Sequence, residues 1–219
     1  MSLRTEPAPR PARIRLPGRY VSMEPLDPDT HGDGIWKASG GEANAHLWQW
    51  MPDGPFPDRE GFDTSLANKK ASEDPLFFAI VDTVTGEALG MASFLRIDPR
   101  HRVIEVGSIM YGPALQRSRQ GTEAMFLMMR YAFDELGYRR YEWKCNALNE
   151  PSRRAALRYG FQFEGIFRQH MIIKGQNRDT AWFSILDSEW PTLKAGFERW
   201  LDPTNFDATG NQLTPLRKS

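Results

Sequence analysis

The chain has 219 residues, of which 40% are hydrophobic and 26% charged, as in globular proteins. Basic and acidic residues both number 28, so the formal net charge is zero and the basic excess typical of nucleic-acid-binding proteins is absent. No run approaches the roughly 18 apolar residues that span a bilayer, and residues 1–19 lack the apolar segment of a secretory signal. We therefore expect a cytoplasmic protein with neither nucleic acid nor a membrane as its partner.

Cysteine and histidine usage argues against cross-links and metal sites. Cys145 is the single cysteine, so no intramolecular disulfide can form, which agrees with a reducing compartment. It could serve as a nucleophile, but free cysteine is among the most buried residue types, which favours a structural role. The histidines lack the close spacing of a metal site, and we expect no metal: His31, His46, His101 and His170.

The N-terminal part is expected to contain a tail, a short hairpin and two helices. Residues 1–12 are rich in proline and poor in apolar residues, which predicts a flexible tail. Residues 13–26 alternate across a Pro-Gly turn and predict a strand or small hairpin. Weak helical patterns cover residues 28–39 and 58–72. The aromatic-rich segment 45–52 between them can bind a ligand or fill the core.

The middle of the chain is predicted to form an antiparallel meander. Residues 76–82 and 88–97 read as strands joined by a hairpin turn. Residues 103–111 alternate with two semi-apolar faces, as an interior strand does. Gly112 and Pro113 then end this strand.

A polar loop and a long helix follow the interior strand. Residues 119–136 carry apolar side chains at helical spacing. The N-terminus of such a helix leaves backbone N–H groups unpaired and suits a phosphate. Arg117 and Arg119 stand beside it, although an ordinary connection with solvated arginines would look the same.

The last part returns to the sheet. Residues 138–146 read as a strand parallel to the interior one. Asn149 is a good N-cap for a helix that ends at Gly160. Residues 161–173 and 179–187 predict a hairpin that extends the sheet, and residues 189–201 an amphipathic helix. This gives one domain over residues 13–201, and a polar C-terminal tail over residues 202–219.

Two motifs resemble those of a known family. Gln116-Arg117-Ser118-Arg119-Gln120-Gly121 is similar to the Gln/Arg-x-x-Gly-x-Gly/Ala pyrophosphate loop of GNAT-type N-acetyltransferases, except that Arg119 stands in place of the first glycine. Residues 149–154 and 159–165 resemble the second coenzyme A motif of the RimJ/RimL-like branch, which reads Asn-x-x-Ser on a short helix and then Gly-Phe-x-x-Glu-Gly. The two motifs occur in the family's order, and the similarity spans residues 13–186.

The resemblance implies a fold and a cofactor. It implies an α+β GNAT-like single domain, with a mostly antiparallel central sheet of about six to seven strands, splayed at the cofactor cleft and flanked by helices. The cofactor would be acetyl-CoA, with pantetheine inserted beside the splayed strand and pyrophosphate at the helix start. The residues implied to bind it are Ile109, Met110, Tyr111, Gln116, Arg117, Ser118, Arg119, Gln120, Gly121, Thr122, Asn149 and Ser152.

The resemblance also implies direct acetyl transfer to a primary amine, which needs a base, an oxyanion donor and an acid. Glu105 is our first choice of base and Glu142 the second, although either could point to solvent or pair with an arginine. In many family members, a tyrosine acts as the acid at the position where this chain has Ala156. Ser152, on the same predicted helix, is therefore the expected acid, unless its hydroxyl is purely structural.

The acceptor is less defined. Trp48 and Trp50 lie in the region that shapes the family's acceptor pocket, and the acceptor is expected to be a small amine or a protein N-terminus. One alternative is a succinyl-CoA-dependent acyltransferase of the same fold. Exposed arginines at 96, 100 and 102 could then bind the carboxylate of the succinyl group. The other is an inactive coenzyme A-binding sensor or scaffold. The tails, the aromatic C-terminal helix and the long hairpin also suggest a homodimer.

Overall fold

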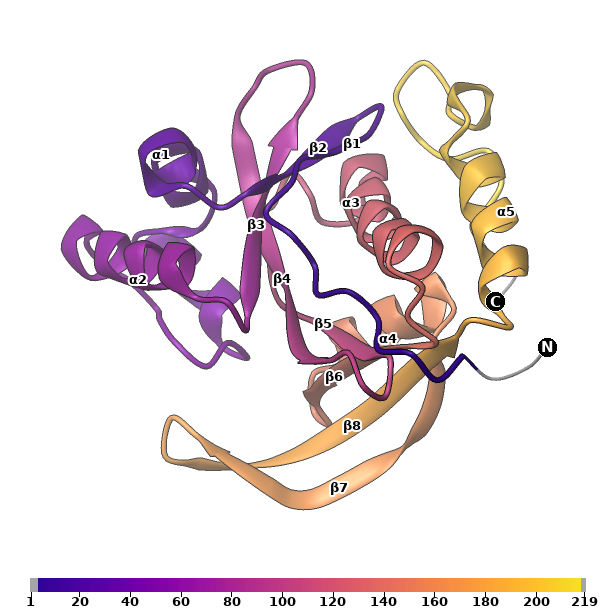
Figure 1. Cartoon of the computed structure of the whole chain (residues 1–219). Coiled ribbons are helices and arrows are strands. Elements are labelled where there is room, and N and C mark those ends of the chain that lie inside the picture. Colours follow the sequence, from indigo (N-terminus) through magenta and orange to yellow (C-terminus); the bar gives the residue numbers. More distant parts are fainter. Residues whose placement is uncertain (1–3, 218–219) are drawn as a thin grey trace.

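The structure is a computed structural model that describes residues 4–217. Within these residues, helices cover both faces of an eight-stranded sheet with the order β1-β2-β3-β4-β5-β6-β8-β7 (Figure 1). The strands are β1 (Leu16–Pro17), β2 (Val21–Pro25), β3 (Leu76–Asp82), β4 (Ala88–Asp98), β5 (Val103–Tyr111), β6 (Arg140–Asn146), β7 (Gln162–Ile173) and β8 (Gln176–Leu186). The predicted mostly antiparallel α+β sheet is confirmed, and β5 and β6 form its parallel pair.

The sheet has more strands than the expected six to seven, because residues 13–26 form two of them. Leu16 and Pro17 pair antiparallel with Met23 and Ser22, so β1 and β2 make a small hairpin at the sheet edge. The next strands form the predicted meander, and the chain then crosses over to β6 by way of α3.

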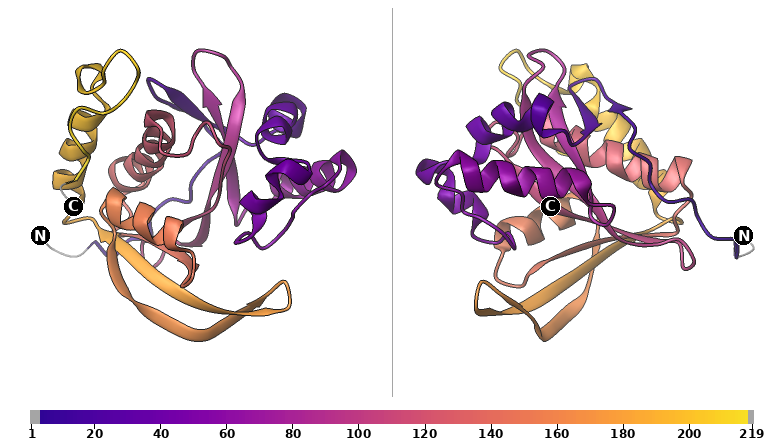
Figure 2. Two further views of the ribbon diagram at one scale, coloured as in Figure 1. Left: turned by 180° about the vertical axis from the view of Figure 1, so that it is seen from behind. Right: turned by 60° about the vertical axis from the view of Figure 1, so that its left-hand side comes forward.

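The helices divide between the two faces of the sheet (Figures 1 and 2). Helices α1 and α2 cover one face, whereas α3, α4 and α5 lie on the other. Their bounds are α1 (Pro28–Ser39), α2 (Arg59–Ala71), α3 (Arg119–Arg130), α4 (Glu150–Tyr159) and α5 (Trp190–Leu201), with 3-10 turns at Glu42–Trp48 and Pro203–Asn205 and a π turn at Tyr131–Glu135 that continues α3. No helix in residues 4–217 is long and apolar enough to cross a membrane.

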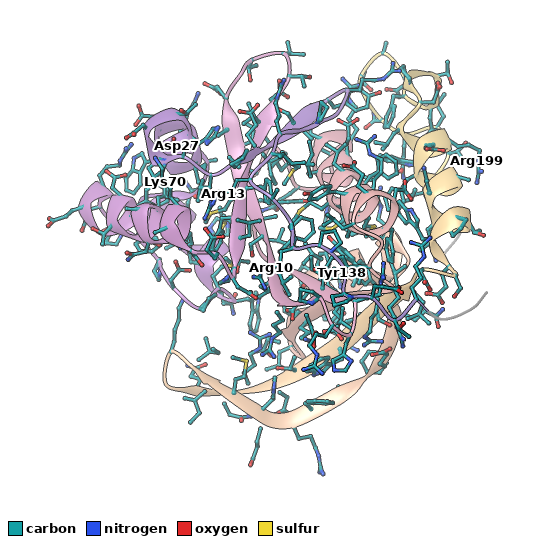
Figure 3. All side chains as sticks on the ribbon, in the orientation of Figure 1. Arg10, Arg13, Asp27, Lys70, Tyr138 and Arg199 are labelled. Carbon is teal, nitrogen blue, oxygen red and sulfur yellow. The ribbon has the colours of Figure 1, made fainter. Side chains whose placement is uncertain are left out.

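Two apolar clusters fill the space between these layers. The larger one lies between the sheet and α3, α4 and α5, and contains Met125, Met128 and Phe197. The smaller one lies under α1 and α2 and contains Ile35 and Phe62. An ion pair from Lys70 of α2 to Asp27, the N-cap of α1, spans 2.8 Å and holds the two helices of this side together (Figure 3).

A β-bulge in β5 is the irregularity that shapes the centre of the sheet. Met91 pairs with Met110 and Ser93 with Gly107. Between these pairs the chain advances by three residues along β5 but by only two along β4. The additional residue is Ser108, whose φ of 49° departs from extended backbone. The expected alternation along residues 103–111 was therefore wrong beyond this point. Ile109 packs against the larger cluster, on the side of Ile104, whereas Met110 belongs to the smaller one.

Strands β5 and β6 separate next to this bulge. Their parallel register runs from Val103 and Arg140 to Val106 and Trp143 and then ends. Both strands continue, β5 to Tyr111 and β6 to Asn146. A bulge bends its strand and increases the local twist, which explains why β5 leaves its neighbour here. The predicted splay of the central sheet is confirmed.

The segments expected as tails contact the domain where the structure describes them; residues 1–3 and 218–219 lie outside that part. Ala8 is buried, and its backbone N–H donates to the carbonyl of Pro99 at 2.9 Å. The Ala12 N–H donates to the hydroxyl of Tyr131 at 3.0 Å. At the other end, Trp200 Nε1 donates to Gln212 at 2.8 Å. These contacts favour extending the domain beyond residues 13–201, and the boundaries stay predictions.

Candidate active site

The loop before α3 is held by its own N-cap, Ser118. The Ser118 hydroxyl accepts from the backbone N–H of Gly121 at 2.9 Å and donates to the carbonyl of Leu115 at 2.8 Å. Its side chain and the Gly121 amide are thus used within the protein. Since α3 starts at Arg119, the amides of Arg119 and Gln120 have no preceding turn to donate to, and these are the donors left for an anion.

Gly121 is required by packing in the loop. A Cβ there would overlap the carbonyl oxygen of Leu115 and press on the Tyr111 ring. The Tyr111 hydroxyl also donates to the Gly121 carbonyl at 2.7 Å, so the tyrosine fastens the start of α3 to the end of β5. Tyr111 therefore contributes a loop contact in addition to any backbone role beside a cofactor.

The cations near the start of α3 differ from those expected. Arg119 lies over the rings of Tyr20 and Phe206, at 4.5 and 5.6 Å, where it makes cation–π contacts. Arg117 is exposed and has a φ of 57°. Arg158, which sequence reasoning missed, donates to the Thr122 hydroxyl at 3.1 Å. Burial lowers the pKa of Arg158, yet an arginine stays charged at neutral pH.

The separated part of β5 leaves one strand edge without a partner strand. Met110 and Tyr111 pair with Met91 and Gly90 of β4 on one side. On the other side, the register with β6 has already ended at Val106. The Gly107 carbonyl accepts from Ser93 of β4, and the Tyr111 carbonyl accepts from Gln116. Among the described strands, the backbone groups between these residues that do not pair with β4 are therefore the ones with which an extended ligand can pair.

A group of buried charges lies on the α1 and α2 face of the sheet, beside this separation. Glu105 and Glu142 stand opposite each other in the β5–β6 register, and Lys144 lies between them, with Nζ at 2.8 Å from Glu105 and 2.7 Å from Glu142. The side chains of Glu105 and Lys144 are only 6% and 5% exposed. Burial raises the pKa of Glu105, against the attraction of Lys144, which lowers it.

Glu142 has two close ion-pair partners, whereas Glu105 has one. Glu142 also accepts from Arg140 Nε at 2.7 Å, and Arg140 reaches Glu164 of β7 as well. Glu105 receives a second cation only at 3.4 Å, from the half-exposed Arg96. Of the two predicted bases, Glu105 has the weaker ties and the raised pKa. Sequence reasoning missed Lys144, because its place between the two carboxylates depends on the β5–β6 register.

The predicted acid lies on the other face of the sheet. Ser152 accepts from Trp143 Nε1 at 3.0 Å, which leaves its own hydroxyl proton to donate. Asn149 caps α4 by accepting from the Ser152 amide at 3.1 Å. Cys145 is buried nearby, and burial raises the pKa of its thiol, which favours the structural role over the nucleophilic one.

The two tryptophans expected at the acceptor site differ in exposure. Trp48 is 1% exposed, and its Nε1 donates to the Ser39 carbonyl at 2.7 Å, so it belongs to the smaller core cluster. We leave it out of the proposed site. Trp50 is half-buried and stays a candidate. The tip of the β7–β8 hairpin reaches this region, since Lys174 Nζ donates to the Trp48 carbonyl at 2.9 Å.

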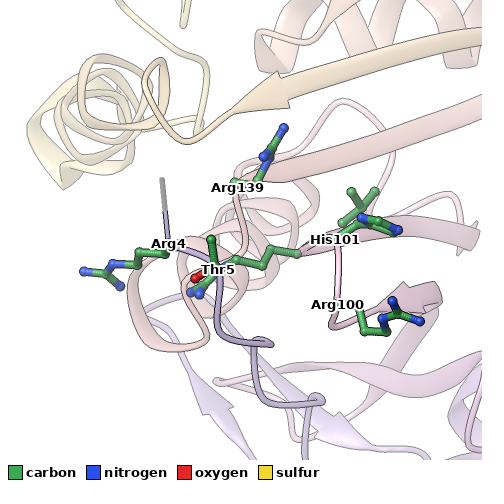
Figure 4. A pocket seen from close by; sticks show the side chains of 7 residues that line it. Arg4, Thr5, Arg100, His101 and Arg139 are labelled. Atoms are coloured by element: carbon green, nitrogen blue, oxygen red, sulfur yellow. The ribbon is translucent and has the colours of Figure 1, made fainter. Parts of the chain in front are cut away.

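A cavity of about 250 Å³ lies at the start of β5, away from the separated strands, and is lined by Arg4, Thr5, Arg100, His101, Arg102, Val103 and Arg139 (Figure 4). The side chains of Arg4, Arg100 and Arg139 point in different directions (Figure 4). Arg102 is buried and donates to the carbonyls of Gly137 and Glu6. Arg100 and Arg102 are therefore remote from the buried charges, whereas Arg96 is next to Glu105.

Comparison with known proteins identifies the family. The acetyltransferase (GNAT) domain family matches residues 26–162, so the chain belongs to the GNAT family of N-acetyltransferases, as predicted. The crystal structure of a GCN5-related N-acetyltransferase from Brucella melitensis superposes with a TM-score of 0.94 and 52% identity, over 96% of each chain. This agreement extends the shared fold to nearly the whole length.

Curated relatives match over a shorter stretch. The uncharacterized N-acetyltransferase YoaA of Bacillus subtilis is 33% identical over 102 residues, 47% of this chain and 57% of that protein. The ribosomal-protein-serine acetyltransferase of Escherichia coli is 30% identical over 108 residues, 47% of this chain and 58% of that protein. The match thus spans under two thirds of each, and the second name agrees with the RimJ/RimL-like resemblance.

Proposed function

We propose that this protein is an acetyl-CoA-dependent N-acyltransferase that transfers an acetyl group to a primary amine by direct attack. The observation that carries the proposal is the separation of β5 from β6 after Val106, next to the bulge at Ser108 and beside the buried Glu105. A strand edge without a partner, a carboxylate on one face and a helix start on the other supply what this reaction needs.

The residues around the separated strands fit coenzyme A. The amides of Arg119 and Gln120, with Arg117 and Arg158 close by, would hold the pyrophosphate. The edge of β5 from Ile109 to Tyr111 would hold the pantetheine. Gln116 and Asn149 border the same space, whereas Ser118, Gly121 and Thr122 act by keeping the loop in shape. Bound acetyl-CoA supplies an acetyl group activated as a thioester.

Glu105 is the proposed base that accepts the proton of the attacking amine. Its burial raises its pKa, which makes the carboxylate a stronger base than one in water. Lys144 holds the carboxylate in place and keeps it ionised. Glu142 is bound by both Lys144 and Arg140, and we assign it a structural role in the charge cluster.

Ser152 is the proposed acid, because Trp143 Nε1 donates to its oxygen and leaves the hydroxyl proton of Ser152 as the donor. The base and the acid lie on opposite faces of the sheet. The reacting groups would meet between the separated ends of β5 and β6. The acceptor amine would enter from the α1 and α2 face, past Trp50, and it is a small amine or a protein N-terminus. The name of the Escherichia coli relative supports the second choice.

Release of free thiol from acetyl-CoA, measured with a panel of amines and N-terminal peptides, tests the proposal. We expect turnover with at least one acceptor, and a decrease in kcat of about 10²- to 10⁴-fold in Glu105→Gln with little change in coenzyme A affinity. Glu142→Gln is the matched control and keeps most of the activity. An inactive Glu142→Gln beside an active Glu105→Gln would reverse the assignment. Binding of coenzyme A without thiol release would indicate the sensor alternative.

A further inference from the structure

Among the residues that the structure describes, the charged side chains around Glu105 include a cation, Arg178, that no carboxylate pairs with. Within residues 4–217, three carboxylates of this group, Glu105, Glu142 and Glu164, pair with three cations, Lys144, Arg140 and Arg96. Arg178 of β8 is the fourth cation of this face, and the structure pairs it with no carboxylate in the described chain. Its Nε is buried and has no hydrogen-bond acceptor there.

The strand register places Arg178 on the same face as Glu105. Trp182 and Thr180 of β8 stand opposite Lys144 and Asn146 of β6, and residues directly opposite in an antiparallel pair share a face. Arg178 is two residues from Thr180 and therefore also on this face. It lies just past the end of β6, where the Ala147 N–H donates to the Asp179 carbonyl at 2.8 Å. This is the end of β6 that has separated from β5.

The surroundings keep Arg178 charged but give it no direct ion pair among the described residues. Burial lowers its pKa, and the nearby Cys145 and Glu105 raise it, so an ionised guanidinium close to the proposed base is maintained. His170, whose Nδ1 lies 3.0 Å from the Thr180 hydroxyl, adds no compensating charge. Burial, followed by the charges of Arg96, Arg178 and Lys144, lowers the pKa of His170 and keeps the imidazole neutral at pH 7.

Two other arginines of this region, Arg153 and Arg168, differ from Arg178. Arg153 also has a buried Nε without an acceptor, but its Nη1 donates to Glu150 at 2.8 Å. Arg168, on β7, is exposed. Arg178 is half-buried, and its buried Nε has no acceptor among the described residues, so a ligand that provides one is favoured there. A carboxylate matches the two-pronged geometry of a guanidinium.

We propose that Arg178 binds a carboxylate carried by one of the two substrates, so that the enzyme selects an acidic substrate. The inference rests on the proposed function. The carboxylate belongs either to the amine acceptor, as in an amino acid, or to the acyl group, as in the succinyl donor considered above. Either source places a charged oxygen pair on the acceptor face, beside Glu105. The residue determines specificity and takes no part in proton transfer.

Thiol release with two matched substrate pairs tests the inference. The first pair is an amino acid and its carboxamide, each with acetyl-CoA; the second is succinyl-CoA and acetyl-CoA, each with one uncharged amine. We expect the wild type to favour the acidic member of one pair by about tenfold or more in kcat/KM. Arg178→Gln removes this preference and keeps the rate with the neutral member, whereas Arg178→Lys keeps part of it. The exposed Arg168→Gln is the control and keeps it fully.

The outcomes separate this inference from the proposed function. Turnover in which the wild type shows no preference in either pair, or in which Arg178→Gln slows both members equally, would overturn the inference and leave the function standing. A complete lack of turnover would reject the function instead. The inference is then tested by binding alone, because an N-acetylated amino acid should raise the melting temperature of the wild type more than its amide does, and should lose that difference in Arg178→Gln. Succinyl-CoA and acetyl-CoA are compared in the same way, and the absence of a difference in the wild type within both pairs would overturn the inference.

Discussion

Single residues decide the electrostatics of this site. Glu105 and Glu142 stand opposite each other in the register, yet their electrostatic environments differ. Arg140 binds Glu142 and not Glu105, and burial raises the pKa of Glu105. Lys144 joins the two carboxylates, and its ammonium lies 3.8 Å from the centre of the Trp182 ring. In the proposed reaction the lysine would therefore act through Glu105, as a positioning residue.

Lys144→Met should change the pH dependence of the reaction. A base must lose its proton to act, so kcat/KM rises with pH as Glu105 deprotonates, and burial places this limb above the ordinary glutamate pKa of 4.5. Lys144 lowers the pKa of Glu105, so its removal moves the limb to higher pH. The measurement is kcat/KM between pH 4 and pH 9, with Glu142→Gln as control. A limb that stays in place while activity falls would show that Lys144 serves only the fold.

At the scale of elements, the bulge in β5 determines where the sheet opens. It adds one residue between Gly107 and Met110. Its effect on the alternation is visible because Ile109 packs on the face of Ile104, whereas strict alternation would place Met110 there. Without Ser108, β5 and β4 would advance by two residues each between the flanking pairs. The side chains of Ile109 and Met110 would stay on their present faces. The bulge is therefore needed for the opening and is not needed for the packing.

Deletion of Ser108 should yield a folded protein that binds coenzyme A poorly. We expect a melting temperature within a few degrees of the wild type, because the apolar contacts of β5 are retained. Coenzyme A at about 100 times its Kd should stabilise the wild type by roughly 2.7 kcal/mol, and thermal shift measures how much of this the variant loses. Ser108→Gly keeps the bulge, since glycine tolerates positive φ, and should respond as the wild type does. A deletion variant with the full shift would contradict the role of the bulge.

Most elements could be predicted from the sequence, and the site only partly. Periodicity and caps located α3, α4 and the hairpin, because these signals are local. The bulge, the partners of Glu105 and the position of Arg178 depend on strand register, which a single sequence does not specify. Trp48 shows the same limit, since an aromatic residue near glycine and proline suits a core as well as a binding loop.

At the scale of the whole molecule, the ends of the chain join the fold. Residues near the N-terminus contact the turn between β4 and β5 and the π turn after α3. The contacts are made by Ala8, by Ala12 and by the bond from Arg102 Nη1 to the Glu6 carbonyl at 2.9 Å. The expected homodimer stays a prediction. Strand β7 at the sheet edge exposes apolar side chains that could serve it, namely Phe163, Ile166, Phe167 and Ile172.

Removal of residues 1–12 should lower the free energy of unfolding by about 1–3 kcal/mol, because buried Arg102 and Tyr131 lose hydrogen-bond partners. Urea unfolding of the truncated and full-length chains measures this difference. Removal of residues 1–5 alone, which keeps Glu6, Ala8 and Ala12, is the control. Equal stability of all three forms would support the boundary at residue 13.

The opposed faces of the sheet have a consequence for the order of events in catalysis. The start of α3 and Ser152 lie on one face, and Glu105 and Arg178 lie on the other. Two molecules that arrive from opposite sides do not block each other's path. For the proposed reaction we therefore expect that neither substrate has to bind first. We also expect each product to leave by the side on which the substrate that it comes from entered.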